Sequence, residues 1–106
     1  MHIELDELTT RKLELNLAEK PGVFKLFVDT EGCGCNGVIV IRIVSRPDDT
    51  DIRIQTEPFT FYVDRQQESL FDEKMRLKAD VDYPSFKLTS DSNLLGNHIR
   101  IQDLRD

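Results

Sequence analysis

Cysteine and long apolar runs are scarce in this chain of 106 residues, and each scarcity excludes a class of protein. Two cysteines cannot form the several disulfides that hold a small secreted scaffold together. The longest aliphatic run, Val38 to Ile41, is far too short to cross a bilayer. The acidic N-terminal residues lack the basic and apolar regions of a signal peptide. We therefore predict a cytoplasmic protein whose thiols are kept reduced.

Positive charge is also in short supply, because the formal net charge is −6. A field of this sign repels nucleic acid and anionic membranes, so neither is predicted as a partner. The sequence has no glycine-rich phosphate loop before a helix and no motif around a nucleophilic side chain. These absences predict a protein that is not an enzyme.

The length predicts a single domain over residues 1–106. Ile3 and Leu5 indicate a short first strand, after which Asp6 is a plausible N-cap for a helix from Leu8 to Glu19. Lys20-Pro21-Gly22 should end that helix. Asp64 can cap a second, short helix that runs to about Phe71.

The rest of the chain alternates apolar and polar residues with a period of two, which predicts strands. These segments are 23–28, 38–44, 52–54, 59–63, 77–81, 86–88 and 99–101. Turn signals lie at residues 90–93 and at Gly96-Asn97. The predicted fold class is therefore mainly β, of the α+β type, with one N-terminal helix and a second short helix.

Both cysteines, Cys33 and Cys35, lie one residue apart between two predicted strands, among glycines at 32, 34 and 37. Thiolates are strong ligands for iron–sulfur clusters and for zinc, so the pair is a candidate metal and cofactor site. The spacing is shorter than that of a zinc finger and is not the Cys-x-x-Cys of thioredoxin-like proteins. Two other interpretations stay open: buried packing cysteines and a redox-responsive thiol pair.

The remaining ligand candidates are weaker. His2 lies at the terminus, and His98 lies just before the last predicted strand, where an exposed polar role is the ordinary one. Asp29 and Glu31 flank the cysteines and could lend an oxygen atom, although an acidic surface is the simpler role for both. Two thiolates do not complete a four-coordinate site, so further ligands must come from elsewhere.

The chain resembles the HesB/IscA-like family, the A-type carriers of iron–sulfur cluster biosynthesis, over most of its length. The resemblance is carried by Thr30-Glu31-Gly32-Cys33-Gly34-Cys35, by the segment Phe59 to Asp64, and by the segment Ser85 to Ser90. It is greatest to a short branch of Gram-positive proteins. Typical members of the family have a cysteine in a mid-chain loop, which Cys33 or Cys35 matches, and a Cys-Gly-Cys pair near the C-terminus. Here residues 97–99, roughly where that pair would lie, are Asn, His and Ile.

The resemblance implies a pseudo-barrel of two small mixed sheets and a role in assembling or delivering clusters. It implies that Cys33 and Cys35 hold a labile iron–sulfur cluster or iron, and that donor or acceptor proteins are the partners. A homodimer would bring four thiolates to one shared cluster. An alternative is a binding module of the same fold that has lost cluster handling. Glycine-rich residues 30–37 are predicted to be mobile and accessible without a ligand.

Overall fold

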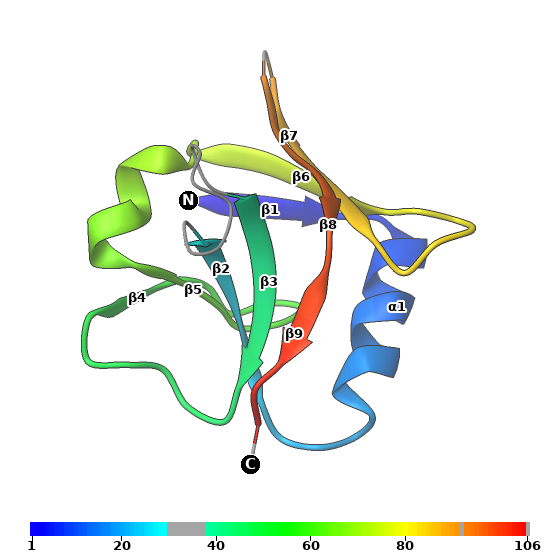
Figure 1. Cartoon of the computed structure of the whole chain (residues 1–106), viewed down its shortest axis with the longest axis horizontal. Helices are drawn as coiled ribbons and strands as arrows, with labels where there is room; N and C mark the ends of the chain where they lie inside the picture. The colour runs from blue at the N-terminus through cyan, green and yellow to red at the C-terminus, as the bar shows by residue number, and fades with distance from the viewer. Residues whose placement is uncertain (30–37, 92, 106) are drawn as a thin grey trace.

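The protein folds into two mixed β-sheets with one α-helix beside them, as the computed structural model shows for residues 1–29, 38–91 and 93–105 (Figure 1). The elements are β1 (His2–Leu5), α1 (Glu7–Leu17), β2 (Val23–Asp29), β3 (Val38–Val44), β4 (Asp51–Gln55), β5 (Phe61–Asp64), the 3₁₀ helix η1 (Arg65–Leu70), β6 (Lys74–Ala79), β7 (Phe86–Ser90), β8 (Leu94–Ile99) and β9 (Ile101–Asp103).

The four-stranded sheet has the order β1-β6-β7-β8, and the five-stranded sheet has the order β4-β5-β2-β3-β9. Each sheet contains both parallel and antiparallel pairs; for example, β1 runs parallel to β6, whereas β6 runs antiparallel to β7. Two mixed sheets and two helices confirm the predicted fold class. In the described part of the chain the sheets stay separate and do not close into a barrel.

The apolar side chains that alternate with polar ones along the strands pack into a single core between the two sheets. Apolar residues of both sheets, of α1 and of the C-cap of η1 are almost fully buried in it: Ile3, Leu13, Phe24, Leu26, Ile41, Ile43, Phe61, Val63, Phe71, Met75, Leu77, Phe86, Leu88 and Ile99. A side-chain amide joins two strand edges beside this core. Gln55 of β4 accepts a hydrogen bond from the Ile3 N–H at 2.6 Å and donates one to the Ile3 carbonyl at 3.0 Å.

The start of α1 follows the prediction, whereas its end comes earlier than expected. The Asp6 carboxylate accepts hydrogen bonds from the Thr9 N–H at 2.8 Å and the Thr9 hydroxyl at 2.5 Å, which confirms the predicted N-cap. The helix ends at Leu17, two residues before the predicted end, because Ala18 and Glu19 have positive φ angles. Asp64 caps η1 by accepting from the Gln66 N–H at 2.8 Å, as predicted.

The strand predicted at 59–63 begins only at Phe61, and three boundary predictions from residue 74 onward are wrong. The strand predicted at 77–81 is β6, residues 74–79, because Asp80 turns the chain by accepting from the N–H groups of Asp82 and Tyr83. Gly96-Asn97 is not a turn and lies inside β8. The single strand predicted at 99–101 is the junction of β8 and β9, and the chain passes from one sheet to the other at Arg100.

Candidate functional site

The predicted ligands Cys33 and Cys35 lie outside the described residues, as does the segment 30–37 predicted to be mobile, so the structure describes the frame around them. That frame is the hairpin formed by β2 and β3. The two strands pair antiparallel from Val23 opposite Val44 to Asp29 opposite Val38. Both cysteines therefore belong to the connection of one hairpin whose ends are held side by side.

A glutamine side chain supports the end of β2 next to this connection. Strand β5 pairs with β2 only from Phe24 to Leu26. Beyond that point the Gln67 side chain of η1 takes the place of a neighbouring strand. Its amide oxygen accepts from the Val28 N–H at 2.9 Å, and its amide nitrogen donates to the Val28 carbonyl at 2.9 Å. A buried backbone group without a partner is costly, so Gln67 stabilises β2 where the cysteine connection begins.

The outward face of the same hairpin is covered by paired charges. The Lys25 ammonium lies 2.8 Å from Oδ1 of Asp51 and 3.3 Å from Oδ2 of Asp48, and the Lys25 and Asp51 side chains are only 6% and 1% exposed. The Arg42 guanidinium stacks on Phe27, 3.9 Å from the ring centre, and its Nε donates to the Gln102 side chain at 3.1 Å. These contacts link β2 and β3 to the neighbouring strands β4 and β9 and so stabilise the hairpin.

The opposite face of the hairpin packs toward the four-stranded sheet. Ile39 of β3 faces Gly96 of β8, where a methyl group added to Gly96 would lie 3.3 Å from the Ile39 side chain. This close approach favours glycine at position 96. It also gives Gly96 a packing role within a strand, where its turn-forming character is not used.

The structure does not bring the two histidine candidates together, and the candidate Glu31 lies outside the described residues. His2 is in β1 and His98 is in β8, at opposite edges of the four-stranded sheet. Three strand spacings of about 4.8 Å separate such edges by roughly 14 Å. Within residues 1–29, 38–91 and 93–105, no three His, Cys, Asp or Glu side chains are grouped so that they could hold a metal ion. The described residues therefore add no ready-made ligand set to the two cysteines.

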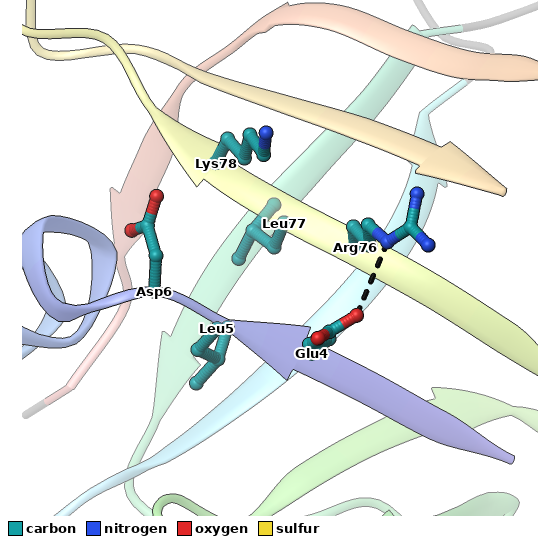
Figure 2. A pocket seen from close by; sticks show the side chains of 6 residues that line it. All are labelled: Glu4, Leu5, Asp6, Arg76, Leu77 and Lys78. Atoms are coloured by element: carbon teal, nitrogen blue, oxygen red, sulfur yellow. Dashed lines mark hydrogen bonds and ion pairs between the residues drawn. The ribbon is translucent and has the colours of Figure 1, made fainter.

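The four-stranded sheet carries several hollows that sequence reasoning missed, and two of them share Lys78. One, of about 250 Å³, is lined by residues from the end of β1 and from β6 (Figure 2), namely Glu4, Leu5, Asp6, Arg76, Leu77 and Lys78. The other, of about 240 Å³, is lined by Lys78, Ala79, Asp80, Ser85, Phe86, Lys87, Asn97 and His98. The alternation of cations with apolar residues in Lys74-Met75-Arg76-Leu77-Lys78 was the signal that could have indicated a charged face.

Near the C-terminus, Arg105 both caps the end of α1 and forms an ion pair with Asp103. The Arg105 guanidinium donates to the carbonyls of Asn16, Leu17 and Lys20, where α1 ends, and pairs with Asp103 at 2.7 Å. Hydrogen bonds from the Arg105 side chain and N–H lower the pKa of Asp103 from its usual 3.8 to about 2. This pair stabilises the last turn of α1 and lies toward the end of the β2–β3 hairpin opposite the cysteine connection, because Asp103 pairs with Ile43 near the end of β3.

Solved structures with the same fold support a common architecture. A proposed Fe–S biosynthesis protein from Lactobacillus salivarius is 21% identical, with a TM-score of 0.80 and all of both chains covered. A second, from Lactobacillus acidophilus, is 15% identical, with a TM-score of 0.77 over 97% of this chain and 90% of that one. Escherichia coli SufA, involved in biosynthesis of iron–sulfur clusters, is 19% identical, with a TM-score of 0.63 over 86% of this chain and 82% of its own.

Sequence comparison extends this likeness from fold to family. No curated protein matches the sequence. In the part of the chain that the structure describes, no helix is long and apolar enough to cross a membrane. The family model described as "Iron-sulphur cluster biosynthesis" matches residues 1–103, nearly the whole chain. The chain thus belongs to the iron–sulfur cluster biosynthesis family.

Proposed function

We propose that this protein assembles or delivers iron–sulfur clusters in the cytoplasm without itself catalysing a reaction, and that Cys33 and Cys35 hold the cluster or iron. The observation that carries the proposal is the placement of the only two cysteines of the chain in the connection between paired strands β2 and β3. Family membership supplies the class of cargo. The thiolates supply the ligand chemistry, because soft sulfur ligands hold iron–sulfur clusters.

The hairpin explains how such a site could be both held and reversible. Its base is fixed by the strand register, by Gln67 and by the Lys25–Asp51 pair. Two thiolates per chain leave a four-coordinate centre incomplete, so a second copy of the chain would supply the other two. A cluster shared between two chains can be released by exchanging thiolates one at a time with an acceptor protein.

The test is anaerobic reconstitution with ferrous iron and sulfide, followed by measurement of bound iron, the visible spectrum and the mass in solution. The wild-type chain should gain charge-transfer absorption and run as a dimer or larger species, and an iron chelator should return it to the apo state. Cys33→Ser and Cys35→Ser should each lose stable cluster retention with an unchanged far-ultraviolet spectrum. Thr56→Ser, a matched change in an exposed loop that keeps both thiols, should behave as wild type.

Two results would contradict the proposal. If either serine variant keeps a full complement of iron, the two thiolates are not both ligands. If the iron-loaded chain stays monomeric without a small-molecule thiol, the cluster is not shared between copies. A colourless wild-type protein that forms a reversible disulfide under a redox series would instead support the thiol-pair interpretation.

A further inference from the structure

The outer face of the four-stranded sheet carries a group of cations that the proposed function does not use. Met75, Leu77, Phe86 and Leu88 point into the core, so the residues that alternate with them point outward. Four of those outward residues are exposed cations, and we call them the basic face: Lys74, Arg76, Lys78 and Lys87.

Two of these cations are placed against each other. Lys78 of β6 lies directly opposite Lys87 of β7 in the antiparallel register. Among the described residues neither ammonium has a carboxylate within ion-pair distance, and the same holds for Lys74. Like charges directly opposite each other destabilise a strand pair. The arrangement therefore lowers stability unless an anion from outside lies between the two lysines.

Two carboxylates near the basic face pair with its arginine, and none lies within ion-pair distance of its three lysines in the described part of the chain. Glu4 lies 3.1 Å from Arg76, and Asp91 lies 3.8 Å from the same guanidinium (Figure 2 shows the Glu4 pair). Asp6 lines the first hollow with Lys78, and its pKa is lowered first by its capping hydrogen bonds from Thr9 and then by the charge of Lys78, although the two groups form no ion pair. Asp80 lines the second hollow and accepts from two N–H groups of its own turn.

The second hollow extends the basic face with further hydrogen-bond donors. The pairs Phe86–Ile99 and Leu88–Gly96 leave Asn97 and His98 together opposite Lys87, as a bulge in β8. His98 has a φ of 53°, in the left-handed region that a residue other than glycine rarely adopts. The bulge places an amide and an imidazole beside Lys78 and Lys87 around the same 240 Å³ hollow.

We propose that the basic face binds an extended acidic segment of the protein that gives or receives the cluster, and this proposal rests on the proposed function. Alternate residues of β6 are about 7 Å apart, which is also the spacing of alternate carboxylates in an extended peptide. The net charge of −6 disfavours a long polyanion, but a short acidic segment stays within about one Debye length, roughly 8 Å, of the cations. The basic face lies on the four-stranded sheet, whereas the strands that flank the cysteine connection belong to the five-stranded sheet.

The experiment uses the apo protein and a defined probe, the synthetic peptide Glu-Ser-Glu-Ser-Glu-Ser. Amide chemical-shift changes on titration should map to β6, β7 and β8, and binding should weaken with added salt. Lys78→Glu together with Lys87→Glu should reduce affinity at least about tenfold, since two charge contacts are reversed. Lys20→Glu together with Arg46→Glu changes the net charge equally at exposed sites off this face and should reduce affinity no more than about twofold.

Several results would overturn the proposal. Equal losses in the two double variants would show a general charge effect, and shifts outside the four-stranded sheet would place the binding elsewhere. Tighter binding of a single-stranded oligonucleotide of six residues to the same face would assign it to nucleic acid. Lys78→Gln with Lys87→Gln repeats the test if charge reversal disturbs the fold, which far-ultraviolet spectra will show.

Reconstitution of the same variants with iron separates this inference from the proposed function. Lys78→Glu with Lys87→Glu should bind as much iron as wild type, because the face provides no ligand. Normal iron binding without peptide binding would overturn the docking proposal alone. Peptide binding at the basic face by a protein that never holds iron would overturn the proposed function. The acidic segment could then no longer be assigned to a protein that gives or receives a cluster.

Discussion

Lysine is buried and paired on the outer face of one sheet, and exposed and unpaired on the outer face of the other. On the outer face of the five-stranded sheet Lys25 is 4% exposed, and its ammonium contacts Asp51 and Asp48. On the outer face of the four-stranded sheet Lys78 is exposed and lies opposite a second lysine, Lys87. The same residue type is a paired structural element in one sheet and an unpaired surface charge in the other.

The difference follows from the cost of removing a charge from water. A buried ammonium loses its hydration and needs a carboxylate partner, so Lys25 is tied to Asp51 by stability. An exposed ammonium keeps its hydration and loses little when a like charge is nearby. Lys78 and Lys87 can therefore remain unpaired within the chain and available to an outside anion, at a small cost in stability.

The largest expected effect comes from breaking the buried pair. Asp51→Asn removes the charge that faces Lys25 and leaves this lysine, whose side chain is 6% exposed, with only the more distant carboxylate of Asp48. We expect a loss of about 3 kcal/mol in the free energy of unfolding, measured by urea denaturation. Asp48→Asn is the matched control, since its carboxylate is 78% exposed, and it should cost less than about 1 kcal/mol. Equal effects of the two variants would refute the contrast between buried and exposed charge.

An intermediate effect is expected at the edge of the five-stranded sheet, where Asp103 is paired with Arg105. Because the pKa of Asp103 in the folded state is lowered to about 2, its contribution is complete above the ordinary pKa near 4 and is lost as the pH falls toward 2. The wild type and Asp103→Asn should therefore differ in unfolding free energy at pH 6, and the difference should shrink steadily below pH 4. A difference that is constant from pH 6 to pH 2 would show that the pair does not titrate as described.

The smallest effect is expected on the basic face, and it has the opposite sign. Lys87→Gln removes the repulsion between Lys87 and Lys78, so it should stabilise the fold by about 0.3 kcal/mol at low salt. The gain should disappear in 1 M salt, where the Debye length is about 3 Å. Arg46→Gln, at an exposed site off the sheets, should change stability less than this. Destabilisation by Lys87→Gln would mean that Lys87 has an internal role.

Much of the fold was predictable from short-range pattern. Alternating apolar residues identified β3 with its observed bounds and β2 to within one residue, and Asp6 and Asp64 were correctly identified as caps. The pattern failed where it could not distinguish one strand from two. Ile99 and Ile101 alternate as one strand does, yet Ile99 pairs with Phe86 and Ile101 pairs with Ile41 in the other sheet.

The candidate site likewise has features that the sequence could predict and features that depend on the fold. The sequence singled out Cys33 and Cys35 because their residue type and spacing are themselves the signal. It contained no indication of Gln67, whose role depends on Val28, 39 residues earlier in the chain. Nothing in the order of residues shows that Lys78 faces Lys87, because the register of β6 against β7 depends on the packing of both strands.

The sequence by itself determined the family resemblance, the two cysteines as candidate ligands, the strand-forming segments and the helix caps. These depend on residue type and on neighbours a few positions away, where backbone geometry and hydrogen-bonding capacity act locally. Only the tertiary structure decided that Lys25 is buried against Asp51, that the chain changes sheets at Arg100, and that four cations share one face. Such features require strands distant in the sequence to come together, and burial in one shared core selects which of them do.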